Sequence, residues 1–285
     1  MKEKRNHQFN YLRIMVKAKN PLKYVLGDIL YYSKLCKYFT FEKGNLRFRF
    51  YPSTVLSHLW KDHAYCDKDL AFYKLFLKQW DIFVDVGANI GLMSLTAAQI
   101  VGQKGIVISI EGFPKTHYYL KRIIELNRFL NIKSYNYIVG SENTYASFVE
   151  KMGDDSQNYV YNDKNGKIPV RRLDNIIDFL DHIDLLKIDV EGYEKFVLLG
   201  ATKILNRVTT IYFEVSQIQY SRYNYGLDEI IDFLEKFNFS IFSLGDDNKT
   251  IHPIKKGCAL RYENLIATRN CQDLLNRTNL RISND

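Results

Sequence analysis

The sequence predicts an α/β fold built on a mainly parallel sheet with helices on both faces. Short apolar runs, such as 82–86, 106–110 and 184–188, alternate with stretches of helical periodicity. Acidic side chains stand at the ends of these runs and of a further run over 209–213. Ligands bind at the carboxyl ends of parallel strands, so we expect the acidic side chains to converge on one crevice. They are Asp85, Glu111, Asp189 and Glu214.

The stretch 82–91 predicts a buried strand, a glycine turn and the start of a helix. Gly87 and Gly91 permit a sharp turn and the close approach of a bound group. Helical spacing begins at Leu92, so the turn would present its ligand to free N–H groups at a helix N-terminus. We therefore predict a small-molecule site at this turn.

An acidic residue at the end of the second strand indicates what that molecule is. Glu111 lies 26 positions after Asp85, against about 20 in dinucleotide-binding units, and is placed to accept hydrogen bonds from ribose hydroxyls. The glycine spacing lacks the middle glycine of a dinucleotide fingerprint, which disfavours a nicotinamide cofactor. The alternative is a glycine-rich turn with an acidic residue nearby by chance. We favour nucleoside binding.

Composition and length indicate a globular chain. At 285 residues, 46% hydrophobic and 14% aromatic, the chain has ample material for a core, which excludes a disordered protein. No apolar run approaches the roughly 18 to 20 residues of a membrane helix. The N-terminal sequence lacks an apolar signal segment, so we expect a cytoplasmic protein.

Cysteine and histidine usage predicts no metal centre. The four cysteines form no Cys-x-x-Cys pair, which argues against a zinc knuckle or a redox dithiol. Free thiols suit a reducing compartment. His58, His63 and Cys66 are close in sequence, but the spacing of the histidines does not place both on one helix face. The cysteines are Cys36, Cys66, Cys258 and Cys271.

Positive charge is concentrated at the N-terminus. Residues 1–37 hold nine Lys and Arg and two acidic residues, a net +7 out of +8 for the whole chain. A basic extension of this kind attracts phosphates or anionic surfaces. The alternative is a solvated arm, and the sequence does not separate the two. The oligomeric state is equally open.

We divide the chain into a basic extension of helices and a hairpin, 1–67, a central domain, 68–270, and a C-terminal tail, 271–285. The pattern predicts these further elements: one or two amphipathic helices over 11–39, interrupted at Asn20-Pro21; a hairpin of 39–41 with 46–50; helices over 68–79, 114–129, 175–180 (N-capped by Asp174) and 228–238; strands over 134–139, 170–173, 239–244 and 263–268; and a loop or irregular hairpin over 152–167.

The run 184–193 places three ionisable groups at one strand end. Lys187 and Asp189 share a strand face, and Glu191 continues it if the strand persists. A tyrosine-rich loop, 220–225, follows the strand that ends at Glu214. Its tyrosines, Tyr220, Tyr223 and Tyr225, suit stacking on a sugar face, and ordinary packing is the alternative.

The runs "FVDVGANIG", "IEGFP", "LKIDVEGYE" followed by "VLLGA", and "IYFE" resemble the FkbM family of S-adenosylmethionine-dependent methyltransferases. The resemblance covers roughly residues 68 to 245. It implies a Rossmann-like, seven-stranded, mainly parallel sheet whose last strand is antiparallel, and S-adenosylmethionine as the cofactor. One departure is Gly112, where the family usually has proline.

The resemblance also implies roles for individual residues. Asp85, Gly87, Asn89 and Gly91 would surround the methionine part of the cofactor, Glu111 would hold the ribose, Phe113 and Ser141 would lie near the adenine, and Asp189 and Glu191 would lie near the sulfonium. Hydroxyl-bearing sugars, glycans or small metabolites are the implied acceptors.

The chemistry leaves three alternatives for the base. Asp189, Glu191 or Glu214 could accept the acceptor's proton if burial raises its pKa. Glu191 and Glu214 could instead cap helices or pair with Lys187. The same carboxylates could assist with a divalent metal, for which the sequence gives no support. Nucleic-acid methylation or binding through the basic arm is a less favoured function, because no Asn-Pro-Pro-Tyr or Asp-Pro-Pro-Tyr run is present.

Overall fold

A computed structural model describes residues 21–62, 64–151, 154–161, 163, 165–258 and 262–283. The chain divides into two compact units, Met1–Tyr65 and Cys66–Asp285. The predicted helix before Pro21 and the histidine at position 63 lie outside the described residues. No disulfide joins the four cysteines, all of which are described.

The first unit contains the predicted hairpin. Strands β1 (Thr40–Lys43) and β2 (Leu46–Arg49) pair antiparallel. Helix α2 (Pro21–Tyr32) is followed by the 3-10 turn η1 (Leu35–Tyr38), and α3 (Thr54–Lys61) follows the hairpin. Aromatic side chains from the hairpin pack on Trp60 of α3, since Phe41 and Phe50 lie 5.6 and 5.7 Å from its ring. This packing joins the hairpin to the helix.

The second unit is organised on a nine-stranded sheet of order β15-β13-β12-β14-β11-β10-β3-β4-β5. Its strands are β3 (Ile82–Val86), β4 (Ile106–Ile110), β5 (Ile132–Tyr135), β10 (Ile183–Ile188), β11 (Val208–Ser216), β12 (Ser240–Leu244), β13 (Thr250–Pro253), β14 (Tyr262–Thr268) and β15 (Arg281–Ile282). From β5 to β11 all neighbours are parallel, and β14 is antiparallel to β11 and β12. The predicted α/β fold and the antiparallel last strand are confirmed, and β13 and β15 extend the expected seven strands to nine.

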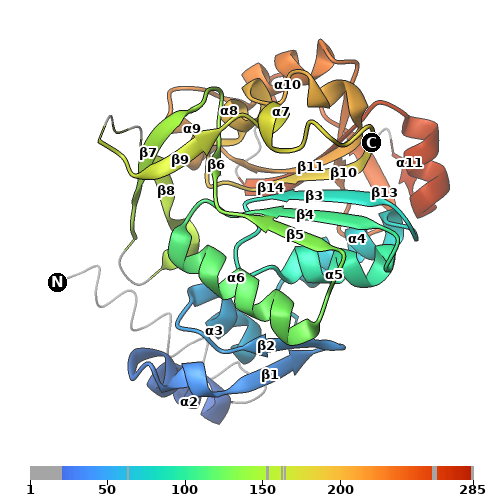
Figure 1. Cartoon of the computed structure of the whole chain (residues 1–285). Helices are drawn as coiled ribbons and strands as arrows, with labels where there is room; N and C mark the ends of the chain where they lie inside the picture. The colour runs from blue at the N-terminus through green and yellow to red at the C-terminus, as the bar shows by residue number, and fades with distance from the viewer. Residues whose placement is uncertain are drawn as a thin grey trace. The chain divides into compact units, whose positions relative to one another are not determined.

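Helices cover both faces of this sheet (Figure 1). On one side lie α4 (Asp67–Phe76), α5 (Leu92–Val101) and α6 (Pro114–Asn127). On the other lie α7 (Leu173–Ile176), α8 (Glu194–Leu199) and α10 (Leu227–Glu235). The strands between them are apolar because both faces are covered; Val84, Ile108 and Leu186 are completely buried.

A second, smaller sheet was not predicted. Its order is β6-β9-β7-β8, with β6 (Ile138–Val139), β7 (Thr144–Val149), β8 (Tyr159–Tyr161) and β9 (Ile168–Arg171). The strand predicted over 134–139 is therefore wrong in extent, because the chain leaves the main sheet after Tyr135 and enters the small sheet at Ile138. The polar stretch 152–167 contributes the short turn η2 (Asp155–Gln157) and β8.

Asp174 does not act as the predicted N-cap. It lies in the first turn of α7, and its Oδ1 accepts hydrogen bonds from the N–H groups of Lys203 and Ile204 at 3.0 and 2.9 Å. Those groups start the 3-10 turn η3 (Ile204–Arg207). The residue type is one that caps helices, but the segment it serves is distant in sequence, which local pattern cannot reveal.

The C-terminal segment forms α11 (Cys271–Thr278) and β15. Arg277 of α11 forms ion pairs with two buried carboxylates at the starts of β3 and β10. Its Nη1 lies 2.7 Å from Asp81 Oδ2, and its Nη2 lies 3.0 Å from Asp184 Oδ1. Asp184 also accepts the N–H of Ile82, which starts β3. One arginine thus ties the C-terminal helix to the beginnings of β3 and β10.

Replacing Arg277 with Met should lower the free energy of unfolding by about 3 kcal/mol, because two largely buried carboxylates would lose their cation. Arg122→Met is the matched control, since Arg122 and its partner Glu125 are both about half exposed, and it should cost less than about 1 kcal/mol. Urea denaturation followed by circular dichroism measures both. Equal losses would contradict this role for Arg277.

Candidate active site

The loop after β3 is shaped by residues with positive φ. The angles are 79° at Gly87, 49° at Asn89 and 87° at Gly91. A Cβ at Gly87 would lie 1.8 Å from the carbonyl oxygen of Asp189, and one at Gly91 would lie 2.5 Å from the side chain of Leu120. The close approach that these glycines permit is therefore to the chain itself, whereas the sequence suggested an approach to a ligand.

Most N–H groups of this loop are already bonded. Those of Gly87 and Ala88 donate to the carbonyl oxygen of Ile110 at 2.9 and 3.1 Å, and that of Gly91 donates to Ala88. The N–H groups of Gly87, Ala88 and Gly91 are therefore not free to bind a ligand. What remains for a ligand is the first turn of α5, whose N–H groups have no partner within the helix.

Glu111 is held at the end of β4 with acceptor capacity to spare. Its Oε2 accepts the N–H of Asn89 and its Oε1 that of Phe113, each at 2.8 Å. Each carboxylate oxygen has a second lone pair, so both can accept another hydrogen bond. Burial raises the pKa of Glu111 to about 7, and the two N–H groups oppose this rise. Asn89 Oδ1 is buried and has no hydrogen-bond partner among the described residues. These free acceptors suit a ligand with hydroxyl or amino donors.

Lys187 on β10 is buried between two carboxylates. Its Nζ lies 3.1 Å from Asp85 Oδ1 and 3.4 Å from Asp189 Oδ2, and it donates to the carbonyl oxygen of Gly87 at 2.7 Å. Burial lowers the pKa of Lys187, but the two carboxylates outweigh burial and hold it above its ordinary value. Asp85 is completely buried and also accepts a hydrogen bond from Ser94. The ion pair of Asp85 and Lys187 thus helps to hold Asp189 and the carbonyl oxygen of Gly87 in place.

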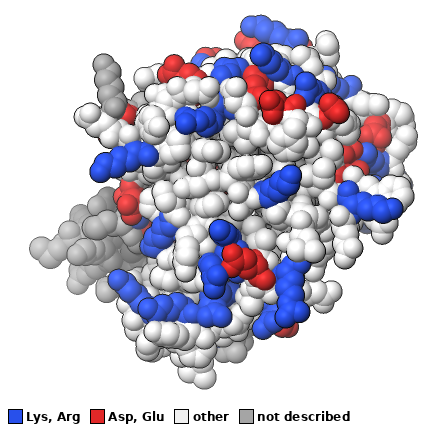
Figure 2. Space-filling model, in the orientation of Figure 1, with Lys and Arg blue, Asp and Glu red and all other residues white. Residues whose placement is uncertain are grey.

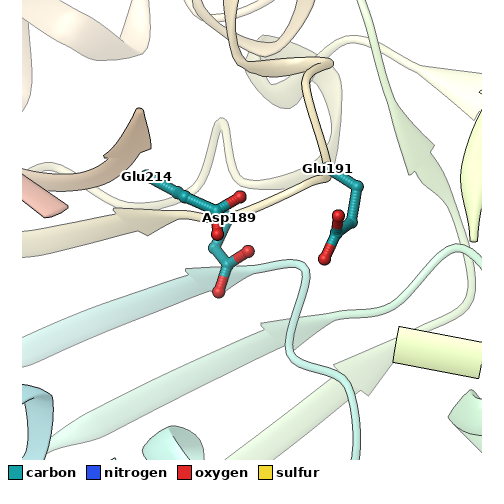
Figure 3. Close-up of side chains that lie close together, drawn as sticks. All are labelled: Asp189, Glu191 and Glu214. Atoms are coloured by element: carbon teal, nitrogen blue, oxygen red, sulfur yellow. The ribbon is translucent and has the colours of Figure 1, made fainter. Parts of the chain in front are cut away.

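Asp189, Glu191 and Glu214 form a carboxylate cluster at the ends of β10 and β11. One oxygen from each side chain lies within 4.8 Å of the other two. Figure 3 shows the Glu214 carboxylate directed toward Asp189, with Glu191 reaching in from the following loop. The predicted convergence of these strand ends is therefore present, and Lys187 and Asp189 share a strand face as expected.

Burial and mutual repulsion change how these acids titrate. Burial, reinforced by Asp189 and Glu194, raises the pKa of Glu191 to about 8. Burial also raises the pKa of Glu214 well above its ordinary value, and Asp189 adds to the rise. Glu214 Oε2 has no hydrogen-bond partner in the described part of the chain. The cluster therefore favours a positively charged occupant.

Glu194 is a site residue that the sequence analysis missed. It is completely buried, and its Oε1 accepts the N–H groups of Val190 and Gly192 at 3.0 and 3.3 Å. Its burial raises the pKa of Glu194 to about 7. These bonds fix the tight turn in which Glu191 has a positive φ of 56°. A glutamate at the start of a helix is usually solvated, so its type and position gave no signal.

The turn after β10 is also held from α9 (Gln217–Ser221). The side-chain amide of Gln219 donates to Glu191 Oε2, and Arg222 donates to the carbonyl oxygen of Glu191. Gln219 is buried, and its own Oε1 has no hydrogen-bond partner among the residues described. The catalytic candidate Glu191 is therefore oriented by a neighbouring helix.

Phe113 and Ser141 lie on separate loops, at the start of α6 and after β6. The ring of Phe113 packs edge-on against Phe148 of the small sheet, with centroids 5.5 Å apart. The carbonyl oxygen of Ser141 accepts a hydrogen bond from Arg172. Asn136 donates a hydrogen bond to the carbonyl oxygen of Gly112, between β4 and α6, at 3.0 Å. Contact of Phe113 or Ser141 with an adenine stays a prediction.

The tyrosines of the loop 220–225 do not form an open stacking surface. The hydroxyls of Tyr220, Tyr223 and Tyr225 donate to the carbonyl oxygens of Glu214, Val160 and Gly192, each at 2.7 Å. Tyr220 and Tyr225 are buried and stack on each other with centroids 4.6 Å apart. Packing, the alternative left open by the sequence, accounts for these two.

The cluster has the oxygen ligands that Mg²⁺ and Ca²⁺ prefer. A cationic cofactor bound in the same crevice would satisfy the same negative charge, so we assign no metal to it. The His58 and Cys66 region shows no metal cluster among the described residues.

Solved structures of low sequence identity share part of this fold. A methyltransferase FkbM from Methylobacillus flagellatus is 14% identical over 85% of this chain and 58% of that one, with a TM-score of 0.44. A SAM-dependent O-methyltransferase from Thermotoga maritima is 15% identical over 72% and 65%, with a TM-score of 0.41. An rRNA methylase from Streptococcus thermophilus is 10% identical over 70% and 93%, with a TM-score of 0.41.

A search of curated proteins finds no match to this sequence. The family model of the methyltransferase FkbM domain, in contrast, matches residues 85–241. That match spans more than half of the chain. It includes the loop after β3, Glu111 and the whole carboxylate cluster. The chain therefore belongs to the FkbM methyltransferase family.

Proposed function

We propose that this methyltransferase transfers a methyl group from S-adenosylmethionine to a hydroxyl oxygen of a sugar, a glycan or another small metabolite. The observation that carries the proposal is the carboxylate cluster of Asp189, Glu191 and Glu214 beside the loop after β3, inside a methyltransferase FkbM domain. The position agrees with the rule that ligands bind above the carboxyl ends of strands where the strand order reverses, here between β3 and β10.

The residues present fit this cofactor. Glu111 keeps a free lone pair on each oxygen for two ribose hydroxyls. Asn89 Oδ1 is a buried acceptor that lacks a partner within the described chain, which suits an amino or hydroxyl donor. The excess of carboxylates over the single buried Lys187 suits a sulfonium cation. Asp85 would contribute by fixing Lys187 and the Gly87 carbonyl.

When bound, S-adenosylmethionine supplies a methyl group that is already activated by its sulfonium. The chain has then to align the acceptor oxygen, accept the proton of its hydroxyl and tolerate positive charge. The side chain of Asp189 is 41% exposed, whereas Glu214 is buried. We infer that Asp189 faces the acceptor and that its carboxylate takes the proton, while Glu191 and Glu214 hold the geometry.

The acceptor class can be tested directly by mass spectrometry. The purified protein should add one methyl group, in the presence of S-adenosylmethionine, to members of a panel of monosaccharides, oligosaccharides and small hydroxylated metabolites. Total RNA and single-stranded DNA form the second arm of the panel. Methylated nucleic acid with unmodified sugars and metabolites would contradict the proposal and favour the basic N-terminus as a nucleic-acid arm.

Asp189→Asn should lower kcat by at least about a hundredfold, because general base catalysis of this kind contributes a hundredfold or more. The affinity for S-adenosylhomocysteine should change by less than about tenfold, since Asn keeps the size and one acceptor oxygen. Asp181→Asn, an exposed site in the same domain, is the matched control. If Asp189→Asn turned over substrate at the wild-type rate, Asp189 would not be the base.

Affinity for S-adenosylhomocysteine should fall as the pH drops below 7. The pKa of Glu111 is raised to about 7, so the ionised form that accepts ribose hydroxyls is lost toward acid pH. One pH unit below the pKa leaves about a tenth of the carboxylates ionised, which predicts up to about tenfold weaker binding at pH 6 than at pH 8.5.

Isothermal titration calorimetry at the two pH values measures this effect. Glu111→Gln should bind more weakly at pH 8.5 and should lose most of the pH dependence, because Gln does not titrate. NAD serves as the control nucleotide and should not compete. An unchanged pH dependence in Glu111→Gln would show that another group is responsible.

A further inference from the structure

Large apolar side chains are unusually exposed in one short part of the first unit. Eight of them lie within residues 22–39, and such concentration on a water-soluble surface marks an interaction site. They are Leu22 (81% exposed), Val25 (39%), Leu26 (49%), Ile29 (58%), Tyr32 (78%), Leu35 (52%), Tyr38 (69%) and Phe39 (50%).

The exposed apolar side chains of α2 lie on the face of the helix that does not pack on its own unit. Leu22, Leu26 and Ile29 follow one another at intervals of four and three residues, so they form one stripe along the helix. Gly27 and Leu30 are the buried positions of α2. A Cβ at Gly27 would lie 3.0 Å from the ring of Trp60, which shows how closely this other face packs on α3. The exposed stripe is therefore a second apolar face.

Positive charge accompanies this stripe. Lys34 and Lys37 are exposed and lie within η1 or directly before it, among the exposed Leu35, Tyr38 and Phe39. Figure 2 shows Lys and Arg side chains beside uncharged surface on the face of the molecule that it draws. The sequence adds six Lys and Arg and one Glu within residues 1–20, directly before α2 in the chain.

We propose that α2 and η1 dock on the surface of an anionic lipid bilayer. The stripe of Leu22, Leu26 and Ile29 would enter the boundary between headgroups and acyl chains, and Lys34 and Lys37 would contact anionic headgroups. An apolar helix face combined with basic residues is the pattern of helices that lie in this interface. No helix in the described ranges has the length and hydrophobicity needed to cross a membrane, so the association is peripheral.

The charge decides between this occupant and a second copy of the chain. Two copies that met through this face would bring two surfaces of net positive charge together, which like-charge repulsion opposes. An anionic surface instead gains from every basic residue that approaches it. The inference does not depend on the proposed function, because binding to lipid needs neither cofactor nor acceptor.

Co-sedimentation with vesicles tests the proposal on the full chain. The protein should sediment with vesicles of phosphatidylcholine and phosphatidylglycerol, and at least tenfold less with phosphatidylcholine alone. Raising the salt concentration should weaken the binding, because salt screens the attraction between lysines and headgroups. Absence of binding to anionic vesicles at low salt would overturn the proposal.

Paired variants separate the apolar and the basic contributions. The double variant Leu26→Glu/Ile29→Glu should lower vesicle binding at least tenfold, whereas Leu130→Glu should not, although Leu130 is 96% exposed. Lys34→Glu/Lys37→Glu should lower binding several-fold and reduce its salt dependence, with Lys249→Glu as the charge control. Thermal melts verify that each variant is folded.

Two results would contradict the inference even if vesicles bind. Unchanged binding of Leu26→Glu/Ile29→Glu would show that α2 is not the docking element. A dimer in sedimentation velocity that the same double variant dissociates would assign the apolar face to self-association.

Discussion

The site depends on one buried ion-pair arrangement, in which Lys187 joins the ends of β3 and β10. Burying a charged lysine without partners destabilises the folded protein. The side chain of Lys187 is only 7% exposed, and its partners are Asp85, Asp189 and the carbonyl oxygen of Gly87. Because Lys187 and Asp85 are cross-strand neighbours in register, the interaction fixes both the register and the spacing of the two strand ends. The absence of a side chain at Gly87 lets the two following loops touch, since its Cβ would collide with Asp189.

Negative charge in excess of Lys187 gives the crevice its chemical character. Asp189, Glu191 and Glu214 meet within 4.8 Å, and Glu194 lies beneath their loop. Burial, reinforced by repulsion from neighbouring carboxylates, raises the pKa values of Glu191 and Glu194 to about 8 and about 7. Such an arrangement is stabilised when a cation binds, so it favours a sulfonium donor. The same group of carboxylates thus attracts the cofactor and provides a base for the acceptor's proton.

The sequence predicted those parts of the structure that follow from local pattern. The apolar runs predicted the central parallel strands, and the acidic residues at their ends predicted Asp189 and Glu214 as neighbours.

The features that the sequence did not predict correctly depend on contacts between residues distant in sequence. Asp174 serves the start of η3 instead of its own helix, and β13 and β15, at four and two residues, are too short to leave a periodic signal. Nor could the sequence show that the N–H groups of Gly87, Ala88 and Asn89 donate to Ile110 and Glu111, because this pairing exists only once β3 and β4 lie side by side. Glu194 was missed for the same reason, because its role arises from the fold of the turn it supports.

We propose that the strand ends of β3 and β10 hold the adenosine and amino-acid parts of the cofactor. A crystal structure of the protein with S-adenosylhomocysteine would test this placement. We expect the ribose hydroxyls on Glu111, a donor group of the ligand on Asn89 and the ligand's sulfur next to the cluster of Asp189, Glu191 and Glu214. Ligand density elsewhere on the molecule, with the space above Gly87 filled by the protein's own side chains, would contradict it.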